Sequence, residues 1–249
     1  MYLYIYDEFV QEKRHEREVA SIENRLTDLG ITGKIIRLAL FKRADEQIRD
    51  EARRGVSTVV VVGNDHTVRK VLDAVVEVGL PLGMIPVGGE SAFARMIGVS
   101  SGVASCDVLS ARVIQQVDVG LLNGKRFVAG LRVLTPEAEL FCDGRYRVTL
   151  TDRGTMEIHN FTTFDAIEQE EVGNPQDGTL DAVIRTDGRR SFFRRKQSCQ
   201  TRLPIHTAFL QSKHPIRVLC DGEEMRADQF QIGVEEGTLK VITGRARKF

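Results

Sequence analysis

Five consecutive residues, Gly63 to Thr67, have the types and the position of a phosphate-binding turn. They interrupt the stretch VVVVGNDHTVRKVL, from Val59 to Leu72, where a strand pattern changes to a helix pattern at the glycine. A tight strand-to-helix turn directs backbone N–H groups and a helix N-terminus at one spot, which suits phosphate. The same letters also fit an ordinary turn in which Asp65 or Thr67 caps the helix. The turn alone leaves both interpretations open.

A second corner with glycines follows the next predicted strand. In PLGMIPVGGESAFARMIG, from Pro81 to Gly98, Gly88 and Gly89 end an apolar run and directly precede a helical pattern. Because the carboxyl ends of parallel strands meet at one edge of a sheet, we expect both corners to line that edge. The pair of corners favours a phosphate site more than either turn does by itself.

Both corners require a parallel sheet to position them, and residues 1–112 have the matching pattern. Strand-like runs alternate with helical periodicity, and the longest predicted helix spans 11–29 and ends at Gly30. The run STVVVVG is apolar on both faces, as a strand buried between two helix layers must be. The alternation predicts an α/β domain with a parallel, three-layer sheet and right-handed crossovers.

After residue 112 the pattern changes to short apolar runs separated by turn signals. These signals are Asn-Gly or Asp-Gly pairs, namely Asn123-Gly124, Asp143-Gly144, Asp187-Gly188 and Asp221-Gly222. Such pairs are typical of two-residue hairpins. We therefore predict a mostly antiparallel β domain over 113–249, with the option that its last strand returns to the first domain.

Composition narrows the class of protein. The 249 residues contain 35 basic and 35 acidic side chains, so no overall field attracts nucleic acid. No apolar run approaches the roughly 20 residues that a bilayer requires, and the N-terminus lacks a secretion signal. Four widely spaced cysteines, Cys106, Cys142, Cys199 and Cys220, favour buried thiols over disulfides or zinc. We expect a cytoplasmic protein.

Several stretches together resemble the diacylglycerol kinase catalytic family of lipid kinases. GNDHT is similar to the family's GGDGT turn, and PLGMIPVGGESAFAR to its P-x-G-x-x-P-x-G-T-G-N-D-F-A-R stretch. In the second half, VDVGLLNGKRF, NPQDGTLDAVI and PIRVLCDGEEM resemble the family's entry to its β domain, its D-D-G-x-L-D stretch and its DGE strand. The resemblance covers nearly the whole chain and implies the same two-domain architecture.

The resemblance implies a role for each matching residue. It makes the two corners the ATP-phosphate site, formed by Gly63, Asn64, Asp65, His66, Thr67, Gly88 and Gly89. It makes Asn174, Asp177 and Thr179 ligands of Mg²⁺, although a plain Asp-Gly turn fits the same letters. It makes Glu223 the catalytic base, with Asp221 beside it and Asp65 organising magnesium. The implied reaction transfers the ATP γ-phosphoryl group to a lipid hydroxyl.

The chain departs from the family pattern at the phosphate side. YDEFVQEKR stands where the family has an N-P-x-S-G turn, and Asn64 and His66 replace glycines of the first corner. In the second corner, G-T-G-N-D becomes Gly88 to Ala92, with Glu90 in place of glycine. A carboxylate about 4 Å from a phosphate charge costs roughly 4 kcal/mol at a surface-like dielectric. Glu90 also fits a harmless first-turn residue favoured by the helix dipole.

Two functional hypotheses follow. The first is an ATP- and Mg²⁺-dependent lipid kinase; the second is a non-catalytic relative that acts as a lipid-binding or regulatory module. NAD kinase is a weaker third, because GGESAFARMIG follows the lipid-kinase arrangement. The basic and aromatic stretch GRRSFFRRKQ fits either a peripheral contact with an anionic membrane or a solvated hairpin. Expected partners are a lipid or such a membrane and a second copy of the chain, without nucleic acid.

Overall fold

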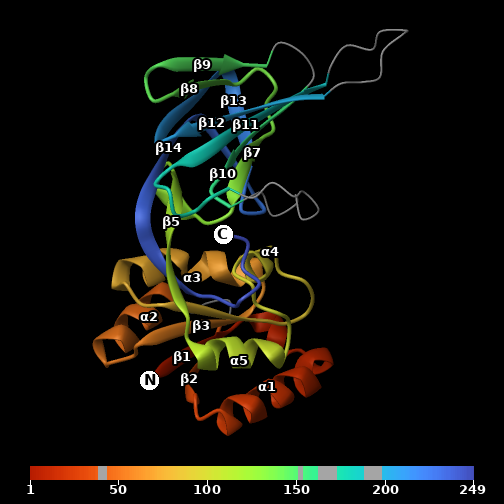
Figure 1. Cartoon of the computed structure of the whole chain (residues 1–249), viewed down its shortest axis with the longest axis vertical. Helices are drawn as coiled ribbons and strands as arrows, with labels where there is room; N and C mark the ends of the chain where they lie inside the picture. The colour runs from red at the N-terminus through yellow and green to blue at the C-terminus, as the bar shows by residue number, and fades with distance from the viewer. Residues whose placement is uncertain (39–43, 151–153, 162–172, 188–197) are drawn as a thin grey trace. The chain divides into compact units, whose positions relative to one another are not determined.

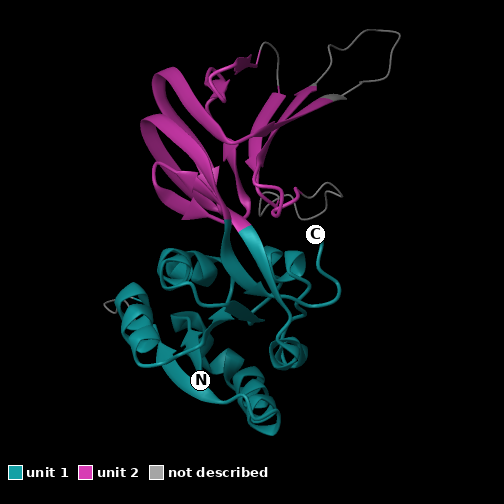
Figure 2. Cartoon of the chain, turned by 60° about the vertical axis from the view of Figure 1, so that its left-hand side comes forward, with its two compact units in different colours: residues 1–117, 237–249 teal, residues 118–236 magenta. Residues whose placement is uncertain are grey.

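The computed structural model describes residues 1–38, 44–150, 154–161, 173–187 and 198–249. The chain divides into two compact units, shown in different colours in Figure 2. Unit 1 contains residues 1–117 and 237–249, and unit 2 contains residues 118–236. The end of the chain therefore belongs to the same unit as its beginning. The predicted boundary after Arg112 lies at the end of a helix inside unit 1.

Unit 1 is built on a parallel sheet with the strand order β2-β1-β3-β4. Its strands are β1 (Tyr2–Tyr6), β2 (Gly33–Arg37), β3 (Thr58–Gly63) and β4 (Leu82–Pro86). The last part of β14 (Glu223–Ile242) joins this sheet in parallel to β4, through Val241 and Leu82. Every residue of β3 is buried, as its apolar sequence predicts.

Helices cover both faces of this sheet. They are α1 (Glu16–Asp28), α2 (Ala44–Arg53), α3 (Asp65–Val78), α4 (Ala92–Met96) and α5 (Ala104–Ala111). Figure 1 shows α2 and α3 on one side of the sheet and α1 and α5 on the other. On the α1 and α5 side, Tyr4, Val60 and Ile85 from three strands pack with Ile22 and Leu109. The predicted three-layer α/β domain is confirmed.

Two helical segments differ from the sequence expectation. The predicted helix over 11–29 begins only at Glu16, because the chain first forms the 3₁₀ turns η1 (Glu8–Gln11) and η2 (Lys13–His15). Glu12 between them has an extended conformation, with φ −67° and ψ 143°, which interrupts any continuous helix. The pattern also gives no prediction of α5, whose eight residues are too few for a clear periodic signal.

Unit 2 consists of antiparallel strands. They are β5 (Ile114–Leu122, which starts in unit 1), β6 (Lys125–Phe127), β7 (Gly130–Val133), β8 (Glu139–Cys142), β9 (Tyr146–Thr149), β10 (Gly154–His159), β11 (Leu180–Asp187), β12 (Ser198–Ile205), β13 (Thr207–Cys220) and most of β14. The main order is β12-β11-β10-β7-β13-β14, with β8 beside β13 and β9 beside β8. One core includes Leu131, Ile158, Ala182 and Val218.

The hairpin predictions can be compared with the backbone. Both residues of each pair have positive φ at Asn123-Gly124, Asp143-Gly144 and Asp221-Gly222, as tight hairpin turns require. These three turns join β5 to β6, β8 to β9 and β13 to β14. Three of the four predicted hairpins are confirmed, and the turn at Asp187-Gly188 lies outside the described residues.

Three of the four cysteines, Cys106, Cys142 and Cys220, are buried free thiols. Burial raises the pKa of both Cys106 and Cys142, which keeps these thiols uncharged at neutral pH. The side chain of Cys199 and the whole GRRSFFRRKQ stretch lie outside the described residues. Across the residues that the structure does describe, no helix combines the length and the apolar character needed to span a bilayer.

Candidate functional site

The carboxyl ends of β1 and β3 form the topological switch point of the unit 1 sheet. β1 lies between β2 and β3, so the chain leaves β1 toward one side of the sheet and leaves β3 toward the other. In open α/β sheets, ligands bind in the crevice outside the strand ends at such a point. The residues that follow these strands are Asp7 after β1 and Asn64 after β3.

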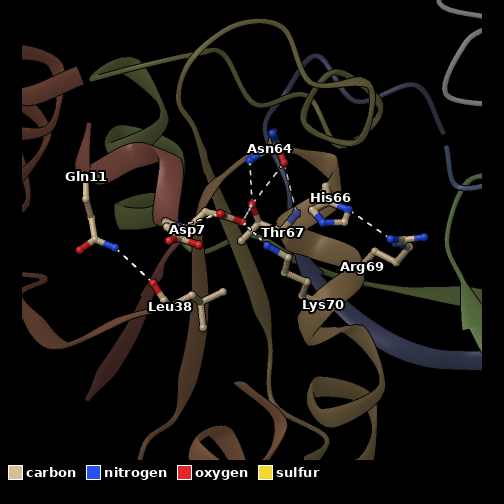
Figure 3. A network of polar contacts seen from close by, with 9 residues as sticks. Asp7, Gln11, Leu38, Asn64, His66, Thr67, Arg69 and Lys70 are labelled. Carbon is tan, nitrogen blue, oxygen red and sulfur yellow. Dashed lines mark hydrogen bonds and ion pairs between the residues drawn. The ribbon is translucent and has the colours of Figure 1, made fainter. Parts of the chain in front are cut away.

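Asp7 is the centre of a polar network at this point. Its side chain is 6% exposed and accepts hydrogen bonds from the backbone N–H of Glu8 at 2.7 Å and from Thr67 Oγ1 at 2.7 Å. Lys70 Nζ, one helical turn along α3, lies 3.1 Å from the same carboxylate (Figure 3). A single cation and two neutral donors thus hold a buried carboxylate at the strand end.

The ionisation of Asp7 follows from these contacts. Burial is the largest influence and favours the neutral acid, but the hydrogen bonds from Thr67 and Lys70 and the charge of Lys70 outweigh it. The pKa of Asp7 is therefore below its usual value. The crevice at the switch point contains a fixed negative charge at neutral pH.

The predicted turn from Gly63 to Thr67 is a helix cap. Asn64 is the N-cap of α3: its side chain accepts from the backbone N–H of Thr67 at 3.2 Å, and Thr67 Oγ1 accepts from the Asn64 N–H at 3.1 Å. A Cβ atom at Gly63 would lie 2.4 Å from Thr67 Oγ1 and 3.3 Å from Asp7 Cβ. Glycine is required at position 63 because the Thr67 side chain fills the space beside it.

Asp65 joins the first corner to the second. Its carboxylate accepts hydrogen bonds from Ser91 Oγ and from the backbone N–H groups of Ala92 at 2.9 Å and Phe93 at 3.1 Å. Ser91 is also the N-cap of α4. The two glycine-bearing turns therefore lie side by side at one edge of the sheet, as predicted.

The second corner has a backbone that only glycine adopts readily. Gly88 has φ +82° and Gly89 has φ +141°. A Cβ atom at Gly88 would lie 2.9 Å from Phe9 Cε2 and 3.1 Å from His15 Cε1. These two rings meet edge to face, with centroids 5.7 Å apart. The YDEFVQEKR segment, which replaces the family's N-P-x-S-G turn, thus packs directly against the second corner.

Cationic and anionic side chains stand at the rim of the two corners. Arg69 Nη2 lies 3.1 Å from Nδ1 of the exposed His66 (Figure 3). Partial burial, followed by the charges of Lys70 and Arg69, lowers the pKa of His66, so its imidazole is neutral at pH 7. Glu90 is exposed on the second corner. The fixed positive charges beside the first corner therefore belong to Arg69 and Lys70.

A cavity of about 490 Å³ opens within unit 1 at the carboxyl ends of β1 and β2. It is lined by Tyr6, Val10, Gln11, Lys13, Glu16, Val19, Ala20, Glu23 and Arg37. Its volume falls in the usual range for small-molecule sites, about 300–1,000 Å³. Burial, and then the carboxylate of Glu23, raise the pKa of Tyr6, which keeps its hydroxyl a donor at neutral pH.

The two acids predicted near the C-terminus differ sharply within unit 2. The carboxylate of Asp221 is buried and accepts from the backbone N–H groups of Val128, Ala129 and Gly130, at 2.7, 2.9 and 3.1 Å. Glu223 is exposed at the first position of β14. Asp221 therefore anchors the turn that precedes Glu223.

The predicted magnesium loop in unit 2 is a compact turn. Asp177 Oδ1 accepts from the Thr179 N–H at 3.0 Å and from Thr179 Oγ1 at 2.8 Å, and Asn174 Oδ1 accepts from the Gln176 N–H at 3.2 Å. Carboxylate, amide and hydroxyl oxygens suit a hard cation. No group of three or more His, Cys, Asp or Glu among the described residues is arranged to hold a metal. Mg²⁺ would therefore need amide, hydroxyl or backbone oxygens here.

Three polar residues of the unit 1 site were not predicted from the sequence. Asp7, Lys70 and Ser91 complete the contacts of the two corners. An acidic residue placed directly after the first predicted strand was the available signal for Asp7. Lys70 shows no such signal, because its partner lies 63 residues away along the chain.

The fold combines an α/β unit, with two glycine-bearing corners at the switch point of its sheet, and a second, antiparallel β unit. Residues 1–122 match the model of the diacylglycerol kinase catalytic domain, and this segment belongs to that family. The resemblance inferred from the sequence motifs is confirmed.

Solved structures support the same architecture for the whole chain. One protein of Bacillus anthracis str. Sterne, described as a diacylglycerol kinase, superimposes with a TM-score of 0.78 and 19% identity, covering 98% of this chain and 97% of that one. A second structure from the same organism, provisionally described as a diacylglycerol kinase, superimposes with a TM-score of 0.80 and 17% identity. The match covers 98% of this chain and 96% of that one. At sequence identities of 17% and 19%, the structural similarity shows the fold alone.

A curated relative matches a smaller part of the chain. An uncharacterised protein of Synechocystis sp. is 35% identical over 84 residues, which are 33% of this chain and 19% of that protein. The chain thus matches about a fifth of that relative's length.

Proposed function

We propose that this protein is a lipid kinase of the diacylglycerol kinase type, which transfers the γ-phosphoryl group of ATP to a lipid hydroxyl. The observation that carries the proposal is Asp65, whose carboxylate joins the two glycine-bearing corners at the switch point of the sheet. Two corners held together at that edge form the cradle that a phosphate chain needs. The family match over residues 1–122 supports the same function.

The residues of unit 1 suggest how the nucleotide would be held. The cavity at the ends of β1 and β2 has room for a nucleoside, and Gln11 offers polar atoms at its wall. Lys70 supplies a positive charge beside Thr67 and the α3 N-terminus. Phosphoryl transfer depends mainly on positioning and charge neutralisation, so a cation at this place contributes directly.

Unit 2 would supply the base and the metal loop. Glu223, exposed beside the anchored Asp221, would accept the proton of the attacking hydroxyl. Asn174, Asp177 and Thr179 would hold Mg²⁺ with further oxygens. When bound, Mg²⁺ neutralises charge that would otherwise destabilise the loop or the phosphates.

A non-catalytic function is the second candidate, and a specific feature favours it. The carboxylate of Asp7 at the end of β1 already engages Thr67 and Lys70, and the exposed Glu90 adds a second negative charge on the second corner. Both carboxylates oppose the binding of a triphosphate. In this case the two-domain scaffold would bind lipid or a regulatory partner without transferring phosphate.

The test is phosphate transfer from γ-labelled ATP to vesicles that contain diacylglycerol or a sphingoid base. We expect a labelled lipid with the wild-type chain, its loss in Glu223→Gln, and its retention in Glu224→Gln, the neighbouring glutamate that pairs with Arg217. A shift of the melting temperature with Mg-ATP, without transfer to any lipid of the panel, would indicate a nucleotide-binding protein without kinase activity. The absence of both a melting-temperature shift and phosphate transfer would support the non-catalytic candidate.

A further inference from the structure

Positive charge is concentrated in two neighbouring segments of unit 1. Residues 91–117 and 237–249 contain one acidic side chain, Asp107, although the whole chain has equal numbers of acidic and basic residues. Asp107 is bound by Arg25 of α1, with Nη2 2.5 Å from Oδ1. The same two segments contain six cationic side chains, namely Arg95, Arg112, Lys240, Arg245, Arg247 and Lys248. Such an uneven distribution in a neutral chain indicates a surface for an anionic partner.

Two backbone hydrogen bonds hold the C-terminal segment against the end of α4. The N–H of Gly244 donates to the carbonyl oxygen of Ile97 at 2.9 Å. The N–H of Lys248 donates to the carbonyl oxygen of Met96, also at 2.9 Å. Arg95 lies in the last turn of the same helix. The cations of the C-terminal segment are therefore placed beside a cation of α4.

This close approach depends on glycine at position 98. Its φ of +73° lies in the left-handed region, and a Cβ atom there would overlap the backbone nitrogen of Arg247. A Cβ atom at Gly244 would in turn overlap the carbonyl oxygen of Gly98. The two glycines thus let the C-terminal segment pack directly on the backbone that follows α4.

Four exposed cations form what we call the basic surface, namely Arg95, Arg245, Arg247 and Lys248. In the described part of the chain, none of these four side chains takes part in an ion pair. Glu18 of α1 lies 3.6 Å from Nδ1 of His15, and Glu90 is exposed on the second corner. Even if Glu90 and a carboxylate at Phe249 are both counted against it, the basic surface has a net positive charge. The acidic stretch 162–172 belongs to unit 2 and lies outside the described residues.

Exposed aliphatic side chains adjoin the basic surface. The backbone N–H of Thr243 donates to the carbonyl oxygen of Val113 at 2.8 Å, so the residues before β5 lie beside the C-terminal segment. Val113 is 45% exposed and Ile114 is 37% exposed. Cations beside aliphatic side chains suit an anionic bilayer, because the charges meet the head groups and the aliphatic groups enter the acyl boundary. Sites for nucleic acid instead combine cations with aromatic or hydrogen-bonding side chains that contact the bases.

We propose that the basic surface, together with Val113 and Ile114, docks unit 1 on an anionic lipid bilayer. Each Lys or Arg near an anionic membrane surface strengthens binding about fivefold. Docking uses exposed side chains of unit 1 and needs no nucleotide. It therefore persists even if the chain transfers no phosphate, which separates this proposal from the proposed kinase function.

The first test is co-sedimentation of the full chain with vesicles of phosphatidylcholine that contain phosphatidylglycerol. We expect binding that weakens as the salt concentration rises, and no binding to pure phosphatidylcholine. The triple variant Arg245→Gln, Arg247→Gln, Lys248→Gln should bind about a hundredfold more weakly.

The matched control removes three exposed cations from unit 2, in the triple variant Arg145→Gln, Arg147→Gln, Lys213→Gln. Its net charge changes by the same amount, so a general attraction of the chain to the membrane would weaken equally in both triple variants. The proposal predicts that the control variant binds the vesicles as the wild type does.

The second test uses fluorescence, because the chain contains no tryptophan. Val113→Trp places a single indole beside the basic surface, and its emission should shift to the blue when the anionic vesicles are added. Tyr146→Trp is the control, since Tyr146 is 63% exposed but belongs to unit 2. Its emission should not change.

Three results would overturn the proposal. They are no binding of the wild type to anionic vesicles, equal losses in the two triple variants, and a blue shift of Tyr146→Trp without one of Val113→Trp. Binding of the basic surface to an oligonucleotide but not to the vesicles would also overturn it. If the first triple variant does not fold, Arg95→Gln decides, since it should weaken vesicle binding about fivefold.

Discussion

Asp7 in unit 1 and Glu157 in unit 2 are both buried carboxylates held in the ionised form, but their partners differ. Asp7 meets one cation, Lys70, and two neutral donors. Glu157 meets two guanidinium groups and an imidazole. Asp7 thus has one cationic partner, whereas Glu157 has two guanidinium partners and an imidazole.

The two buried carboxylates therefore organise the side chains around them differently. At the switch point of unit 1, Asp7 completes a closed network, so any incoming phosphate must compete with it for Lys70 and Thr67. On the sheet of unit 2, the buried carboxylate of Glu157 holds Arg132, Arg185 and His159 in place.

The largest expected effect comes from removing the charge of Glu157. Glu157→Gln leaves Arg132 and Arg185 near one another without their shared carboxylate, and breaking a buried pair in this way costs about 4 kcal/mol. Urea unfolding measures the loss in the free energy of unfolding. Glu224→Gln breaks only the exposed pair with Arg217 and should leave the unfolding midpoint unchanged. Equal effects of the two variants would remove the contrast between a buried and an exposed pair.

The free energy of unfolding at acid pH should show a second large effect of Glu157. Its pKa falls from an ordinary 4.5 to about 2 on folding, which corresponds to about 3 kcal/mol of stability. Because the folded pKa is the lower one, this contribution is complete above about pH 4.5 and is lost as pH falls toward 2. The free energies of unfolding of the wild type and Glu157→Gln should therefore converge as the pH approaches 2. A constant difference between them across that range would contradict the assignment.

Crowding the first corner should have a smaller effect. Gly63→Ala places a Cβ atom 2.4 Å from Thr67 Oγ1, so the Asn64 and Thr67 cap must move at a cost of about 2 kcal/mol. Gly233→Ala is the matched control, since the nearest atom to its added Cβ is 3.9 Å away. Thermal unfolding compares the two variants, and a neutral Gly63→Ala would show that Thr67 does not fill that space.

The smallest of these effects belongs to Asp7. Asp7→Asn removes a hydrogen-bonded charge and should cost about 1.5 kcal/mol at pH 7. Since the pKa of folded Asp7 lies below its ordinary value of 3.8, the stabilisation is present above that pH and disappears as pH falls further. Urea unfolding at pH 7 and pH 3 gives the comparison. An Asp7→Asn deficit as large at pH 3 as at pH 7 would mean that the charge is not what stabilises the network.

The sequence predicted the parts of the molecule that local chemistry determines. Gly88 and Gly89 predicted a corner between a strand and a helix, and Asn123-Gly124 and Asp221-Gly222 predicted hairpins, because few other residues adopt the backbone conformations that such turns need. The apolar run of β3 likewise required a buried parallel strand.

The contacts that complete the sites were not predictable in this way. Lys70 meets Asp7 across 63 residues, and Arg132 and Arg185 meet at Glu157 only because three strands pair in one register. The extended Glu12 that delays α1 has no strong local signal either. Long-range pairing, rather than residue type, decides which side chains come together.

The central claim is that the corner from Gly63 to Thr67 receives the phosphates of a nucleotide with the help of Lys70. Calorimetric titration with Mg-ATP tests it most directly, using the wild type, Lys70→Ala and Lys240→Ala. Lys240 belongs to the same unit and contacts only the carbonyl oxygen of Gly79, at 3.2 Å, in the described residues. We predict one binding site, weakened about tenfold or more in Lys70→Ala and unchanged in Lys240→Ala. No binding by the wild type, or equal binding by all three, would contradict the account.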